Sequence, residues 1–325
     1  MKQVIKHIAV IAAGVAILGG SGLAAADTYP SRPITLVVPF APGGVTDSAA
    51  RLIGKSLGTR LGQPVVVENR AGGGGAVATE YVGRSKADGY TLLFGSRVTQ
   101  ITNPLINKTR LPTDKDFTAI YTVCDAPAII VTNAKSPFKD VRELVTYAQK
   151  NPGKVNLATA GNGTAAHLAA LVFMEITKTN LTHVPYRGSS PAIQDLLAGN
   201  VDIAFDYPSS TLGFIRAGSL RALASLSEKR LTVLPNVPSI SEAGVKGAES
   251  ASWLAVFAPA KTPADISARL TTVMGQVMNE PEVQQRLNEL GTVPMAIGGK
   301  DLQTLMNRET VRWREVVSRT PITTD

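Results

Sequence analysis

The stretch from Val37 to Leu52 reads VVPFAPGGVTDSAARL. It begins with the last two residues of an apolar strand predicted over 34–38, passes through a Pro/Gly loop and continues as a helix predicted over 46–57. That helix carries Ala50, Ile53 and Leu57 on one face, at the spacing of an amphipathic helix. A strand that runs through a glycine loop into a helix is the repeating unit of α/β sheets. This stretch therefore predicts an α/β protein.

The same unit recurs along the chain. Further strands are predicted over 64–68 and 90–94, with a helix over 76–85 between them. The pattern then restarts, with strands over 128–131, 155–158, 181–186 and 201–205 and helices over 141–149, 164–177 and 192–198. Two runs of this kind predict two α/β lobes, each built on a parallel sheet with both faces covered.

The last third of the chain has too few strands for a third lobe. Only the strands 221–225 and 253–257 and the helices 264–278 and 302–317 are predicted there. We expect this part to return to the first lobe, so that the chain crosses twice between the lobes. Such a fold has a ligand cleft between the lobes and a hinge.

The first 26 residues have the features of a secretory signal peptide. Lys2 and Lys6 precede an apolar run over 8–18, and three alanines end at Ala26. An uncleaved anchor is the alternative. We predict cleavage after Ala26, a first lobe over 27–124, a second lobe over 125–225 and a return to the first lobe over 226–325.

Composition excludes several classes of protein. The single Cys124, expected to be a small buried residue, excludes an intrachain disulfide and a multi-cysteine zinc site. With only His167 and His183 after the leader, we predict no metal and no cofactor. The chain has 33 Lys and Arg against 25 Asp and Glu without a basic run, so no nucleic-acid partner is expected. The net charge of +8 agrees with an anionic small ligand.

The first loop is a candidate anion site. Gly43 and Gly44 would let backbone N–H groups approach a ligand, and the helix after them begins with unpaired N–H groups and a positive dipole end. Thr46 or Asp47 can cap that helix, and the Asp47 carboxylate would compete with an anion. An ordinary strand-to-helix turn is the alternative. The candidate residues of this loop are Phe40, Ala41, Gly43, Gly44 and Thr46.

The second run contains a matching loop. Residues 156–171 read NLATAGNGTAAHLAAL, a strand end, a glycine loop and a helix start. Both loops follow the carboxyl ends of strands, where open α/β sheets bind ligands. We therefore expect the two loops to hold one anion from both sides. The candidate residues here are Thr159, Ala160, Gly161, Gly163 and Thr164.

Three other features leave alternatives open. His167 could belong to the core, cap the helix or face the cleft, and His183 is expected to be structural. Asp206 could orient a ligand or cap a turn before Pro208. The glycine run 72–75 lacks the spacing of a dinucleotide site, and we expect a tightly turning loop there.

Seven segments occur in the order typical of one family: VVPFAPGGVTDSAARLIGKSL, VVVENRAGGGGAVA, DGYTLLFGS, LATAGNGTAAHLA, VPYRGSSPAIQDLLAGNVDIAFD, LPNVPSISEAG and SWLAVFAPAKTP. The chain resembles the Bug-type, or TctC-type, extracytoplasmic solute receptors of tripartite tricarboxylate transporters. The resemblance covers the chain after the leader.

The resemblance implies a periplasmic binding protein of the two-lobed type II kind, the Venus flytrap fold. It implies a monomeric receptor, not an enzyme, that captures a mono- or dicarboxylate and delivers it to membrane permease subunits. It implies a carboxylate clamp made by the loops 40–46 and 159–164, to which we add Ser96, His167, Arg187, Asp206 and Tyr207 as candidates. A ligand sensor acting on a signalling partner is one alternative. An exported hydrolase is another, but the chain has no G-x-S-x-G and no partnered histidine.

Overall fold

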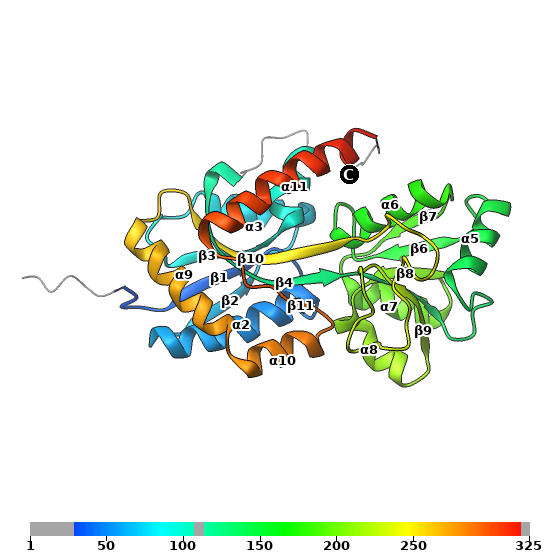
Figure 1. Cartoon of the computed structure of the whole chain (residues 1–325), viewed down its shortest axis with the longest axis horizontal. Helices are drawn as coiled ribbons and strands as arrows, with labels where there is room; N and C mark the ends of the chain where they lie inside the picture. The colour runs from blue at the N-terminus through cyan, green and yellow to red at the C-terminus, as the bar shows by residue number, and fades with distance from the viewer. Residues whose placement is uncertain (1–28, 107–113, 320–325) are drawn as a thin grey trace, which may run out of the picture. The chain divides into compact units, whose positions relative to one another are not determined.

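The computed structural model describes residues 29–106 and 114–319. The predicted leader lies outside the described residues. From Arg32 onward the chain forms one compact unit that contains two β-sheets. Figure 1 shows these two sheets with helices packed around each.

The first sheet has the strand order β11-β4-β10-β3-β1-β2. Its strands are β1 (Ile34–Val38), β2 (Val65–Asn69), β3 (Thr91–Ser96), β4 (Phe117–Pro127), β10 (Ala251–Pro259) and β11 (Val293–Pro294). Only β1, β2 and β3 run parallel to one another. The prediction of an all-parallel sheet is therefore wrong, because the return strand β10 inserts antiparallel between β3 and β4.

The second sheet has the order β7-β6-β8-β5-β9. Its strands are β5 (Ile129–Asn133), β6 (Asn156–Thr159), β7 (Thr182–Pro185), β8 (Ile203–Asp206) and β9 (Leu220–Ser225). Strand β6 pairs in parallel with β7 and β8, whereas β5 pairs antiparallel with β8 and β9. In both sheets the predicted strand-loop-helix units form the parallel part.

Two paired strands connect the sheets. Strand β4 leads into β5, and β10 returns beside it, antiparallel, from Ala251 opposite Pro127 to Pro259 opposite Phe117 (Figure 1). Cys124 lies inside β4 and is fully buried, as expected. Residues 226–250 stay with the second sheet, because Leu226, Ile240 and Val245 belong to its core. The chain re-enters the first sheet only at β10, so the predicted boundary at 226, where the chain was expected to return to the first lobe, is wrong.

Helices cover both sheets. The predicted helices correspond to α2 (Val45–Leu61), α3 (Ala76–Gly83), α5 (Val141–Lys150), α6 (Ala165–Thr177), α7 (Ser189–Ala198), α9 (Ala264–Met278) and α11 (Gly299–Arg319). The short helical turns η1 (Gly73–Gly75) and η3 (Asp114–Asp116), together with η2 (Val98–Thr102), α4 (Asn103–Ile106), α8 (Pro208–Arg216) and α10 (Pro281–Glu289), were not predicted. Within the described ranges no helix combines the length and the apolarity that a membrane crossing requires.

Helix α6 belongs to both cores. Its small side chains Ala166, Ala169 and Ala170 pack into the second-sheet core. Leu168 lies instead in the core of the first sheet, with Leu171 and Val172 packed against it. This helix therefore joins the two halves near the loop that precedes it.

Candidate ligand-binding pocket

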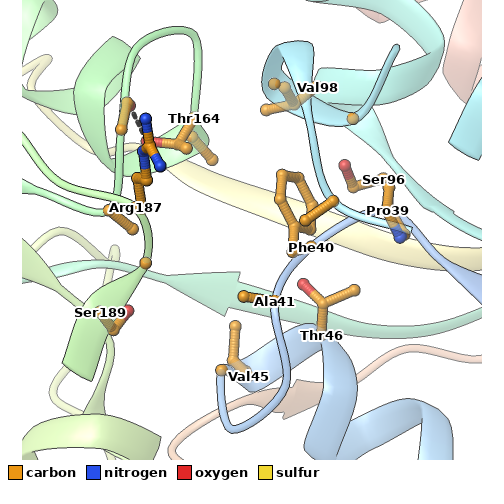
Figure 2. A pocket seen from close by; sticks show the side chains of 18 of the residues that line it. Pro39, Phe40, Ala41, Val45, Thr46, Ser96, Val98, Thr164, Arg187 and Ser189 are labelled. Atoms are coloured by element: carbon orange, nitrogen blue, oxygen red, sulfur yellow. Dashed lines mark hydrogen bonds between the residues drawn. The ribbon is translucent and has the colours of Figure 1, made fainter. Parts of the chain in front are cut away.

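A cavity of about 670 Å³ lies between the two sheets. One wall is made by first-sheet loops, the other by second-sheet loops, and the paired strands β4 and β10 contribute the floor. Its lining residues are Pro39–Pro42, Gly44–Thr46, Ala71–Gly75, Ser96, Val98, Ala126, Ala160–Asn162, Thr164, Ala165, Tyr186–Pro191, Tyr207, Ser252 and Leu254. Figure 2 shows Phe40 and Val98 on one wall and Thr164 and Arg187 on the other.

The first loop runs from the end of β1 into α2. The N-cap of α2 is Gly44, and no side chain caps it, so neither Thr46 nor Asp47 has the expected capping role. Asp47 instead folds back on the loop, where its Oδ2 accepts a hydrogen bond from the Gly43 N–H at 3.0 Å. Gly43 does not line the cavity, and its N–H is bound to Asp47.

The Asp47 carboxylate is bound within the chain by a cationic group and an amide group. Arg51 donates to it from Nε at 3.1 Å and from Nη2 at 2.9 Å, and Asn69 donates from Nδ2 at 2.9 Å. Burial acts to raise the pKa of Asp47, but the hydrogen bonds from Arg51, Gly43 and Asn69 outweigh it and hold the pKa below its usual value. The carboxylate thus fixes the loop from behind.

The second loop runs from β6 into α6 and is held by neutral groups. Thr164 is the N-cap of α6; its hydroxyl accepts from the His167 N–H at 3.3 Å and donates to the Gly161 carbonyl at 2.8 Å. The Gly163 N–H donates to His167 Nδ1 at 3.1 Å. His167 therefore supports the loop through Gly163, and neither of these residues lines the cavity.

Two histidines stack behind this loop. The rings of His167 and His183 are 4.1 Å apart and nearly parallel. His183 Nε2 lies 2.7 Å from Thr159 Oγ1, and Thr159 is fully buried and does not line the cavity. Burial, and then the neighbouring His183, lower the pKa of His167 to about 4. The imidazole that accepts the hydrogen bond from the loop is therefore uncharged near pH 7.

Asp206 organises a turn and does not line the cavity. Its Oδ1 accepts from the Tyr207 N–H at 2.7 Å, from Ser210 Oγ at 2.8 Å and from Ser189 Oγ at 2.9 Å. Burial raises the pKa of this carboxyl. Of the two roles considered for Asp206, the structure supports the turn, through which it orients the lining residues Tyr207 and Ser189.

Ten of the fifteen candidate residues line the cavity, and the five others lie within its loops or next to them without lining it. Those that line it are Phe40, Ala41, Gly44, Thr46, Ser96, Ala160, Gly161, Thr164, Arg187 and Tyr207. The sequence reasoning missed the glycine run 72–75 as a wall, the α7 start at 188–191 and the floor residues Ala126, Ser252 and Leu254. The run of four glycines was the available sequence signal at 72–75, and all four have positive φ in the structure.

The walls come close to each other across the cavity. A Cβ placed on Gly74 would lie 3.5 Å from the Asn162 carbonyl of the opposite loop. A Cβ on Gly188 would lie 3.8 Å from the Cβ of Ala41. The two halves therefore face each other closely here, since a Cβ at either position would be in ordinary van der Waals contact with the opposite loop.

Comparison with known proteins gives a consistent picture. Protein BugT of Bordetella pertussis is 36% identical over 317 residues, which is 97% of each chain. The structure of R. palustris Rpa4515 with adipate has a TM-score of 0.86 and 35% identity, over 91% of this chain and 99% of that one. MatC (Rpa3494) of Rhodopseudomonas palustris with bound malate has a TM-score of 0.83 and 32% identity, over 89% of this chain and 100% of that one.

These similarities confirm the two-lobed periplasmic-binding-protein fold that the sequence predicted. The family model described as the tripartite tricarboxylate transporter family receptor matches residues 49–321. The family consists of solute-binding receptors, so the expectation of a receptor and not an enzyme is confirmed. The chain belongs to the TctC family of tripartite tricarboxylate transporter receptors.

Proposed function

We propose that this receptor binds a small organic acid in the cavity, with a carboxylate held between the loops 39–46 and 159–164. The observation that carries the proposal is the direction of the helices. Helices α2, α6 and α7 all begin at the cavity, since Gly44, Thr164 and Gly188 are their N-caps and all three line it. Helix N-termini present unpaired N–H groups and the positive end of the dipole, which favour an anion.

The charges of the lining support the same ligand class. Among the described residues that line the cavity, Arg187 is the one with a formal charge, and none is acidic. A ligand ammonium group would therefore have no counter-charge, whereas a second carboxylate can approach Arg187. The adipate and malate bound by the two similar structures belong to this class.

The physiological setting follows from family membership. We propose that the protein is exported by cleavage after Ala26, acts as a periplasmic monomer and delivers its ligand to the permease subunits of a tripartite tricarboxylate transporter. Transport is preferred to signalling because the family is that of a transporter receptor.

Calorimetry on the purified protein tests the ligand class. We expect binding of succinate, malate or adipate and no binding of the matching diamides or diamines. Exclusive binding of neutral or cationic solutes would contradict the proposal.

A further inference from the structure

The floor of the cavity contains a buried hydroxyl group that the proposed carboxylate clamp does not use. Ser252 is the second residue of β10, lines the cavity and is 3% exposed. Its Oγ has no hydrogen-bond partner within the described part of the chain. A buried hydroxyl without a partner is unfavourable by about 1–3 kcal/mol, so this group needs an acceptor or donor from outside the chain.

The strand geometry directs this hydroxyl into the cavity. Side chains alternate along a strand, so Ser252 and Leu254 face the same side, and both line the cavity. Trp253 between them points the other way, into the core of the first sheet. On the paired strand, Ala126 lies opposite Ser252 and offers only a methyl group.

Three of the other hydroxyl groups in the lining are already bound within the chain. Thr164 Oγ1 donates to the Gly161 carbonyl at 2.8 Å, and Ser189 Oγ donates to Asp206 at 2.9 Å. Tyr186 donates its hydroxyl to Asp195 at 2.6 Å. Ser252 differs from these three because it is buried, lines the cavity and lacks a partner.

We propose that Ser252 is a specificity-determining residue that hydrogen-bonds an oxygen substituent on the carbon chain of the ligand. The inference rests on the proposed function and narrows it to hydroxy- or oxo-substituted acids. A serine hydroxyl can donate to a carbonyl or hydroxyl oxygen and can accept from a ligand hydroxyl. An unsubstituted acid fills the same space but leaves the Ser252 hydroxyl unpaired, and sites of this kind discriminate against the analogue that lacks the polar group.

Matched ligand pairs test the proposal on the full protein. Calorimetry with succinate and malate, glutarate and 2-hydroxyglutarate, and adipate and 3-hydroxyadipate gives one affinity ratio for each pair. The wild-type protein should bind the hydroxy acid of at least one pair about fivefold to tenfold more tightly, the effect of one neutral hydrogen bond. In Ser252→Ala that ratio should fall to about twofold or less, while the affinity for the unsubstituted acid stays within about twofold.

Ser250 provides a matched control. Its hydroxyl is also buried and without a partner, but it does not line the cavity. Ser250→Ala should therefore keep the wild-type ratio. Ser252→Cys, whose thiol is somewhat larger and donates only weakly, should give the same lowered ratio as Ser252→Ala, and melting temperatures verify that each variant is folded.

Two outcomes would overturn the inference. One is a wild-type protein that binds both members of every pair equally. The other is a Ser252→Ala variant that weakens both members by the same factor, which would make Ser252 a partner of the shared carboxylate. If no acid in the panel binds at all, the proposed function fails instead, and the two failures are therefore distinguishable.

Discussion

The two loops that face each other across the cavity have similar backbones but different chemical supports. Each follows a parallel strand, contains glycines and ends at a helix N-terminus. The loop 39–46 is held by the ionised carboxylate of Asp47, which Arg51 neutralises. The loop 159–164 is held by hydroxyl groups and the neutral imidazole of His167. The comparison teaches that one loop geometry can be supported with or without charge, and that acid and mutation should affect the two loops differently.

Removal of Asp47 should have the largest effect. In Asp47→Ala the Gly43 N–H and the Asn69 amide lose their acceptor and Arg51 loses its counter-charge. We expect the free energy of unfolding to fall by about 2–4 kcal/mol, measured in urea, and ligand affinity to fall with it.

The Glu80–Arg84 pair gives the control for this variant. It has the same i,i+4 spacing but lies on the surface. Glu80→Ala should change the unfolding free energy by less than about 0.5 kcal/mol. Equal effects of the two variants would show that Asp47 does not support the loop.

Acid should weaken the second loop through His167. Its folded-state pKa of about 4 lies below the usual 6.5, so the folded protein binds fewer protons than the unfolded chain between these values. The stability from the neutral imidazole is complete above pH 6.5 and is lost as the pH falls to 4, an effect of about 2–3 kcal/mol. Urea unfolding from pH 4 to pH 7 measures the slope. His167→Gln should flatten it, and an unchanged slope would assign the pH dependence to other groups.

Glycine-to-alanine substitutions separate strain from steric block. Gly161 has φ +135°, and a Cβ there would lie 2.9 Å from the Tyr186 carbonyl, so Gly161→Ala should cost about 1–2 kcal/mol of stability. A Gly161 substitution would therefore weaken binding through the backbone even without touching the ligand.

Gly44 has φ −83° and open space where a Cβ would lie. Gly44→Ala should leave the melting temperature unchanged and still weaken binding. Normal binding by Gly44→Ala would mean that the ligand does not approach the α2 N-terminus.

Arg187 should have the smallest effect, because its side chain is exposed. Arg187→Gln should weaken binding of dicarboxylates by about twofold to fivefold, as expected for an exposed ion pair, and leave monocarboxylates of equal length unchanged. Arg187→Lys should retain most of the dicarboxylate affinity. Equal losses for both ligand classes would show that Arg187 does not contact a second carboxylate.

Local patterns predicted the strand-loop-helix units and both glycine loops, because their determinants lie close together in the sequence. They did not predict β4, because the buried residues of this strand do not follow the two-residue alternation of a half-buried strand. The predicted helix over 192–198 starts three residues after the observed start of α7 at Ser189, although the intervening Pro191 fits the first turn of a helix. The roles of Asp206 and Ser252 depend on partners brought together from distant segments. No local pattern contains that information.

The pairing of β4 with β10 has a consequence for how the two halves can move. The two connections are hydrogen-bonded to each other along nine registered positions, so they form a single two-stranded ribbon and not two independent tethers. Such a ribbon bends across its face much more easily than it shears along its hydrogen bonds. Relative motion of the halves should thus approximate a single coordinate, the bend angle. One pair of spectroscopic labels, placed on the outer surfaces of α5 and α9, would then be enough to follow the whole transition in time.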